Sequence, residues 1–269
     1  MMRLLDSLKL ILNTGMPHDF FGGMVYVLEK YGNLFLKGLL TTILLALFGT
    51  VFGLVIGMVI SLIRQTKITT RDPFIIKFSK KIGHVFSTIY VQYLRGTPML
   101  VQGMIVHLGL SRAGFKVNPL LLGIVVISIN TSAYMAEILR SSIGAINKGQ
   151  LEAARAIGMT EVQGMRYFVL PQAFKNALPA IGNEFVVNAK DSSVLNVIMV
   201  AELFYQAKII GQITYRPLEP LILISLIYLT ITILSTYLLN KLEQKMDKPK
   251  GTYPTSMTHQ VHHFKGEEI

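Results

Sequence analysis

Five long apolar runs divide the chain, and each is long enough to cross a lipid bilayer as a helix. The first run, Gly38–Ile63, has 26 residues and no charged side chain, whereas about 20 apolar residues suffice to span the hydrocarbon core. The other runs are Ile82–Leu110, Val117–Ala136, Ala177–Ala201 and Leu221–Asn240. We therefore predict an all-α, polytopic membrane protein with five transmembrane helices.

The segments on either side of these runs have a different character. We assign residues 1–31 to an N-terminal segment in which Phe20–Tyr31 is either an interfacial helix on the outer surface or a flexible leader. Residues 32–241 would form the transmembrane domain, and residues 242–269 a disordered tail. For the three histidines near the end of this tail we favour a solvated role over a metal site.

The composition agrees with a membrane protein and excludes several chemistries. Hydrophobic residues make up 51% of the chain and charged residues only 15%. Without cysteine, the chain has no disulfide and no thiolate metal site. No GxxxxGK[ST] phosphate-binding motif occurs, so we expect no ATP hydrolysis by this chain. Because the sequence indicates neither a soluble domain nor paired carboxylates in a pocket, we expect no other enzyme activity and no cofactor.

The second apolar run is interrupted by Arg95-Gly96-Thr97-Pro98. Glycine and proline together break or kink a helix, and Pro98 leaves a carbonyl of the preceding turn without its helical donor. A charged side chain beside such a break must face protein or water rather than lipid. We therefore predict a helix break here that faces protein or water rather than lipid.

Other polar residues lie within or beside the third and fourth runs. Glu137 stands three residues before Arg140, so it could belong to a surface ion pair worth roughly 0.2–0.5 kcal/mol, or to a gate. Lys190 and Asp191 are adjacent and should point to different helix faces. The polar set could line a transport path or form a structural network. Its members are Asn130, Glu137, Asn183, Glu184, Asn188, Lys190 and Asp191.

Glycines recur every four residues in the first run, at Gly49, Gly53 and Gly57, and so share one helix face. This spacing of small residues allows close helix packing in lipid. We interpret the face as a packing surface, within one chain or between two.

Between the third and fourth runs, residues 149–171 predict a helix–Gly–helix elbow. Gln150–Ile157 is a run of helix formers, with Glu152 placed early, where a carboxylate favours the helix N-terminus. Gly158 can adopt the left-handed conformation that ends helices. Thr160–Gln163 matches a capping box, so a second helix should begin there and end or turn at Pro171. Ala153, Ala154 and Ala156 would give the first helix a small-residue face.

This elbow resembles the coupling loop of ABC importer permeases, the membrane subunits of ATP-driven uptake systems. The resemblance lies in Glu152, Ala153 and Ala154, then Gly158, then Leu170 and Pro171, at the family's spacing. Phe168 stands where the family usually has isoleucine. Arg95–Pro98, Ala133–Arg140 and Lys190–Ser193 resemble the polar amino acid uptake subfamily.

The resemblance implies a bacterial inner-membrane permease that works with several partners. They are a pair of ATPase subunits docked on the elbows, a second permease subunit (identical or related), and an extracytoplasmic substrate-binding protein. An amino acid is a zwitterion, so its site needs a carboxylate for the ammonium group and donors for the carboxylate. The polar residues near the third and fourth runs could supply both.

The net charge of +11 supports the orientation that the resemblance requires. With the elbow in the cytoplasm, the N-terminus lies outside and the C-terminus inside, and cytoplasmic segments hold 16 of the 26 basic residues against 8 on the opposite side. Such an excess is typical of cytoplasmic loops, so we expect no nucleic-acid partner. An ion-coupled secondary transporter is the main alternative, but the spans show no internal repeat. A non-transporting scaffold would need no elbow.

Overall fold

The computed structural model describes residues 17–247 apart from 18, 67 and 71, and this part of the chain is helical without strands. Residues 1–16 and 248–269, which include the three histidines, lie outside the described residues, whereas residues 242–247, which we assigned to a disordered tail, are the last turns of a helix. The helices are α2 (Phe20–Gln65), α3 (Phe74–Gly96), α4 (Met99–Arg112), α5 (Pro119–Gly144), α6 (Lys148–Ala156), α7 (Glu161–Gly164), a π-helix (Met165–Val169), α8 (Leu170–Asp191), a 3-10 helix (Ser192–Ile198), α9 (Leu203–Thr214) and α10 (Leu218–Asp247).

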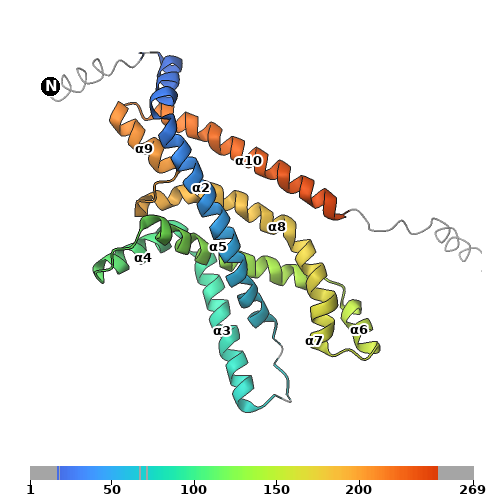
Figure 1. Cartoon of the computed structure of the whole chain (residues 1–269). Coiled ribbons are helices and arrows are strands. Elements are labelled where there is room, and N and C mark those ends of the chain that lie inside the picture. The colour runs from blue at the N-terminus through green and yellow to red at the C-terminus, as the bar shows by residue number, and fades with distance from the viewer. Residues whose placement is uncertain (1–16, 18, 67, 71, 248–269) are drawn as a thin grey trace, which may run out of the picture.

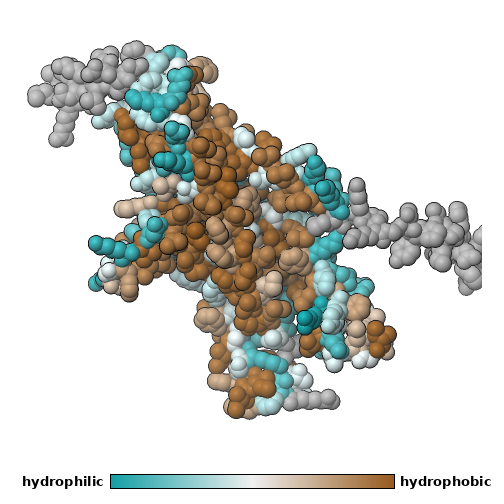
Figure 2. All heavy atoms as spheres, in the orientation of Figure 1, coloured by the Kyte–Doolittle hydropathy of each residue, from teal (hydrophilic) through white to brown (hydrophobic). Residues whose placement is uncertain are grey.

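The centre of the molecule is a group of three helices: α2 lies along α5, and α8 packs against both (Figure 1). Helix α10 packs on α8 and α9, while α3 runs beside α5. Much of the visible surface is apolar, and hydrophilic residues gather toward the ends (Figure 2). This distribution is the one expected of a protein whose solvent is largely lipid.

Three of the described helices are long and apolar enough to cross a membrane: Phe20–Gln65, Pro119–Gly144 and Leu218–Lys245. A fourth span is possible if Glu161–Ile198 and Leu203–Thr214, which meet at a bend of 53°, cross together. The second predicted span is built from two helices, α3 and α4, which are separated at Thr97 and Pro98. The all-α prediction is confirmed, and the predicted break is where the sequence placed it.

The first span differs from its predicted extent. Phe20–Tyr31, for which we considered an interfacial helix or a flexible leader, is continuous with the first apolar run in the single helix α2. Its 46 residues correspond to about 69 Å at 1.5 Å per residue, about twice the thickness of the hydrocarbon core. Asp19 caps this helix by accepting a hydrogen bond from the Gly22 N–H. The helix therefore extends well beyond the membrane.

The predicted glycine face is where α2 meets α5 inside the chain. A Cβ atom added at Gly49, Gly53 or Gly57 would come within 2.8 Å of Ile127, within 2.8 Å of Thr131 and within 2.6 Å of Met135, respectively. Because side chains cannot fit in these gaps, the glycines let the two backbones approach closely. The glycine face therefore packs against α5 of the same chain, which is the first of the two alternatives considered.

Gly57→Ala should destabilise the protein, by about 1–3 kcal/mol, because the added methyl group also meets the Ser132 backbone oxygen at 2.8 Å, where no side chain can yield. The thermal unfolding midpoint in detergent measures the effect. Gly32→Ala is the matched control, since it lies in the same helix with nothing within 4 Å of the added atom. Equal midpoints for the two variants would contradict the close approach.

Candidate functional site

The helix break and part of the predicted polar set meet at one cavity of about 450 Å³. Arg95, Gly96, Thr97 and Pro98 form one side of it, between α3 and α4. Helix α5 contributes Asn130, and α8 contributes Glu184, Asn188 and Asp191. Met99, Tyr134 and Val187 complete the lining. The sequence thus identified most of the lining residues, although they are up to 96 residues apart in the chain.

The backbone opens at the break because Thr97 is extended (φ −124°, ψ 146°) and Pro98 begins the next helix without an N–H to donate. Gln102, buried on α4, compensates for this opening. Its Nε2 donates to the carbonyl oxygens of Leu94 (2.9 Å) and Thr97 (3.0 Å), and lies 2.8 Å from the Thr97 hydroxyl oxygen. Gln102 therefore holds the break in a defined shape.

Sequence reasoning did not select Gln102, although its position gave a signal. It stands four residues after Pro98 and so faces back toward the broken turn. Asn130 joins the same arrangement, because its Nδ2 donates to Gln102 Oε1 at 3.0 Å. The break, Gln102 and Asn130 are one hydrogen-bonded unit that links α3, α4 and α5.

The cavity carries charges of both signs. Arg95 lies over the ring of Tyr134, with 5.4 Å between the guanidinium carbon and the ring centroid, a cation–π contact that fixes its position. Glu184 and Asp191, two turns apart on α8, supply carboxylates. One side of the cavity can therefore bind an anionic group and another a cationic group.

Asn188 has a structural role beside its place in the cavity lining. This buried side chain accepts a hydrogen bond from the Thr131 hydroxyl at 2.8 Å and donates to Thr50 Oγ1 at 3.0 Å. It thereby connects α8 with α5 and α2. The structural network considered for the fourth run is therefore present at Asn188, while the same helix also lines the cavity.

Three residues of the predicted set lie outside this cavity. Glu137 binds Arg64 of α2 at 2.8 Å and also pairs with Arg140, so the expected ion pair forms and includes a second arginine. Asn183 and Lys190 are exposed and are not part of the lining. As expected, Lys190 and Asp191 lie in different surroundings.

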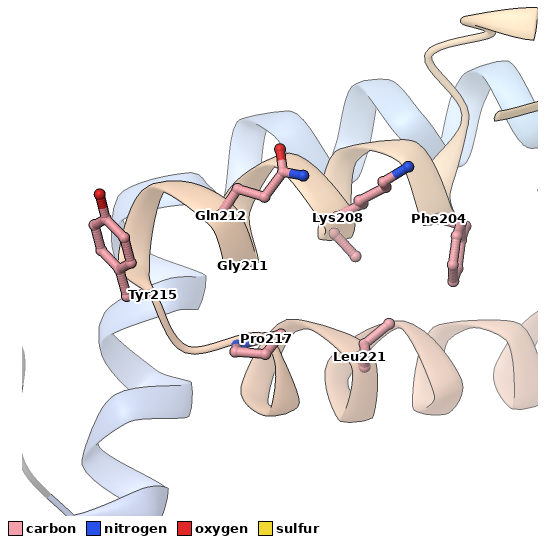
Figure 3. Close-up of a pocket in the computed structure, with 8 residues that line it drawn as sticks. Phe204, Lys208, Gly211, Gln212, Tyr215, Pro217 and Leu221 are labelled. Atoms are coloured by element: carbon pink, nitrogen blue, oxygen red, sulfur yellow. The ribbon is translucent and has the colours of Figure 1, made fainter. Parts of the chain in front are cut away.

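A larger cavity, about 720 Å³, lies between α9 and α10 and contains none of the predicted residues (Figure 3). Phe204, Ala207, Pro217 and Leu221 make its lining largely apolar, and Lys208 is its charged member. Without a carboxylate it cannot neutralise an ammonium group. We therefore place the candidate site in the smaller cavity, despite the difference in size. Helix α9 itself was not expected from the sequence.

The elbow has the predicted outline. Gly158 has φ +86°, the left-handed conformation that follows the end of α6. Thr160 and Gln163 form the capping box, in which Thr160 Oγ1 accepts from the Gln163 N–H at 3.2 Å and Gln163 Oε1 from the Thr160 N–H at 2.8 Å. Both local signals in the sequence are confirmed.

Three details of the elbow differ from the expectation. Helix α6 begins earlier, with Asn147 as its cap, so Glu152 is in the second turn, where the helix dipole has little effect. Ala154 is buried against Gly164, which leaves Ala153 and Ala156 as the exposed small residues. Pro171 neither ends nor redirects the helix, because a π-helix over Met165–Val169 precedes it and α8 continues from Leu170.

Apolar side chains on the outer surface of the elbow were not anticipated. Ile157 is 72% exposed and Val162 75% exposed, and Tyr167 is also exposed. The elbow also contains an ion pair between Arg155 and Glu161 at 3.0 Å. Exposed apolar groups on a short, internally braced element mark a surface that another protein can cover.

Comparisons with known proteins agree with this arrangement. Residues 73–248 match the family model described as binding-protein-dependent transport system inner membrane component. The arginine transport system permease protein ArtQ of Bacillus subtilis (strain 168) is 39% identical over 67% of this chain and 78% of its own length. The glutamine transport system permease protein GlnP of Escherichia coli (strain K12) is 35% identical over 64% of this chain and 80% of its own.

A solved structure described as an amino acid ABC transporter with histidines is 38% identical, covers 86% of this chain and 100% of its own, and superposes with a TM-score of 0.75. These findings favour the ABC permease interpretation over the ion-coupled alternative. A permease subunit of this kind is not itself catalytic. The chain belongs to the family of binding-protein-dependent transport system inner membrane components, the multi-pass permease subunits of ABC importers.

Proposed function

We propose that this chain carries polar amino acids across the membrane and that its substrate passes through the cavity at the helix break. The observation that carries the proposal is that one cavity is lined by both the basic side chain of Arg95 and the acidic side chains of Glu184 and Asp191. A zwitterion needs both kinds of partner, because an unpaired charge away from water is costly. The arginine and glutamine substrates named for the similar permeases are consistent with it.

The substrate would bind with its carboxylate toward Arg95 and its ammonium group toward α8. Asn130 and Tyr134 line the same cavity and can complete the polar contacts. Asn183, Lys190 and Glu137 were also predicted for the path, but they are outside the cavity, so we assign them no direct contact with the substrate in this conformation.

The proposed transporter contains two permease subunits, identical or related, two ATPase subunits and an extracytoplasmic binding protein. The chain would have its N-terminus outside and its C-terminus in the cytoplasm, as the distribution of basic residues favours. Each elbow, from Glu152 through Gly158 to Pro171, would dock on an ATPase subunit through its exposed apolar residues. Closure of the ATPases would then move the elbows and rock the helices between inward- and outward-facing states.

Reconstitution with its ATPase and binding-protein partners tests the proposal. We expect uptake of radiolabelled arginine or glutamine into vesicles that requires ATP and continues when ionophores remove ion gradients. A sugar measured in parallel is the control. It should not accumulate, because a neutral sugar has no ammonium or carboxylate group to bind the charged side chains of the cavity. Uptake driven by an ion gradient without ATP, or accumulation of the sugar alone, would refute the proposed function.

A further inference from the structure

Helix α3 has an unusual surface at its first turns, which we call the α3 foot, Phe74–Lys81. Phe74 and Ile75 are 81% and 80% exposed, and Phe78 is exposed as well. The rings of Phe74 and Phe78 stack with their centroids 6.2 Å apart. Three lysines, Lys77, Lys80 and Lys81, lie in the same turns. The foot therefore presents aromatic and basic groups together.

From helix geometry we infer that the α3 foot lies beyond the membrane surface. The charged cluster of Arg64 and Glu137 marks where α2 leaves the apolar region, and just beyond it His84 Nε2 lies 2.7 Å from the carbonyl oxygen of Thr66. Phe74 is ten residues before His84, at the end of α3 that is remote from the cavity. Ten residues of helix correspond to about 15 Å at 1.5 Å per residue. The interfacial layer adds only about 5–8 Å to each side of the hydrocarbon core.

The foot cannot lie flat on the lipid as an amphipathic surface helix does. Such helices lie in the plane of the interface. Here Phe74 belongs to one helix that runs without interruption to Gly96 at the cavity, so its direction is set by the part that crosses the bilayer. The exposed aromatic groups therefore point into the aqueous phase, where they are unfavourable unless another protein covers them.

The connection before α3 braces the foot. Asp72 Oδ2 accepts from the Thr69 N–H at 2.9 Å and pairs with Lys80 at 2.8 Å, and Lys77 Nζ donates to the Thr70 carbonyl at 3.1 Å. The hydrogen bond from Lys80 holds the pKa of Asp72 below its ordinary value. A surface held in place in this way loses little conformational entropy when it binds a partner.

The foot and the elbow project from the same end of the molecule (Figure 1). The last turns of α2 and α5 and the start of α8 converge there around a small apolar cavity lined by Leu62, Ile143 and Leu170 among others. A protein that docks on the elbow therefore approaches the end of the molecule from which the foot also projects (Figure 1).

We propose that the α3 foot is a second contact surface for the ATPase subunit, fitting an apolar pocket rimmed by carboxylates. The proposal rests on the proposed function, in which the elbow supplies the first contact. Two separated contacts would resist rotation of the ATPase about the elbow, so that its closure moves the helices rather than turning freely. The stacked rings would provide the apolar contact and Lys81 a charge at its rim.

Photo-crosslinking in the assembled transporter, in native membranes, tests this surface. Phe74, Ile75 and Phe78 are replaced one at a time by p-benzoylphenylalanine, an aromatic residue that resembles the two native phenylalanines. Ile157 on the elbow is the positive control, and the exposed Leu229 on α10 is the lipid-facing control. We expect adducts with the ATPase from the foot and the elbow, and none from Leu229.

The outcomes separate the two proposals. Adducts from Ile157 but only lipid adducts from the foot would overturn the second contact and leave the elbow intact. Adducts from the foot without adducts from Ile157 would contradict docking of the ATPase on the elbow and would support its contact with the foot. As a second measurement, Phe74→Ser with Phe78→Ser should lower ATPase retention on the purified permease about tenfold. Phe86→Ser, an exposed position on the membrane side of His84, should leave retention unchanged.

Discussion

Asp191→Asn should lower amino acid uptake about ten- to hundredfold while leaving the amount of protein in the membrane and the affinity of the binding protein unchanged. Asp191 lines the same cavity as Arg95 and has no ion pair among the described residues, so its charge is available for a substrate ammonium group. A charge-assisted hydrogen bond contributes about 1.5–3 kcal/mol, and 1.4 kcal/mol corresponds to a tenfold change. Initial rates of radiolabelled uptake in vesicles measure the loss.

Glu184→Gln should act in the same direction, since the second carboxylate lines the same cavity. Lys190→Gln is the matched control, because Lys190 is adjacent to Asp191 in sequence but does not line the cavity. We expect it to retain most of the uptake. Normal transport by both acid variants, or equal losses in all three, would show that the path lies elsewhere in the protein.

The helix break and the elbow could be predicted because their signals are local. Gly96 and Pro98 disfavour a helix whatever surrounds them, and the break lies where they stand. Gly158 and the Thr160–Gln163 capping box likewise act within one turn of the backbone. In each case the chemistry of the chain over a few residues decides the conformation, and no distant contact is needed.

The membership of the cavity could be predicted only in part, because it depends on how each helix is rotated in the bundle. Asn183 and Glu184 are neighbours, yet only Glu184 faces the cavity. The rotation of α8 follows from its contacts, among them the buried hydrogen bonds of Asn188 to α2 and α5. Such contacts join residues 57 and 138 positions apart, which no local pattern specifies. The role of Gln102 could not be predicted for the same reason, because it depends on contacts with two other helices.

Neither the length of α2 nor the continuation of the helix through Pro171 was predicted, and the reasons differ. We assigned residues 1–31 to a separate N-terminal segment, but a helix need not end where it leaves the membrane. The outer turns of α2 pack on α9 and α10. At Pro171 the sequence predicted that the helix ends or turns, because proline lacks a donor. The π-helix before it changes the hydrogen-bond spacing: the Leu170 N–H bonds to the Met165 carbonyl, so the helix continues.

Gly158→Val should abolish transport coupled to ATP hydrolysis while the protein still inserts into the membrane. Gly158 has φ +86°, and nothing lies within 4 Å of an added Cβ atom. The effect is therefore strain in the backbone, about 1–2 kcal/mol or more for a β-branched residue, rather than a clash. The strained turn should open and misplace the two short helices of the elbow. Substrate-stimulated ATP hydrolysis in the assembled transporter measures the coupling, and membrane content is measured beside it.

Gly158→Asn is the matched control at the same position, because asparagine tolerates the left-handed conformation better than other residues with a side chain. We expect it to retain most of the coupling, although its side chain is larger than the hydrogen it replaces. Coupled activity that survives in the valine variant would show that the elbow does not transmit the motion. Loss in both variants, with normal insertion, would instead indicate that the partner needs the space around Gly158. Nothing in this chain lies within 4 Å of an added Cβ atom, so the asparagine side chain would occupy only that open space.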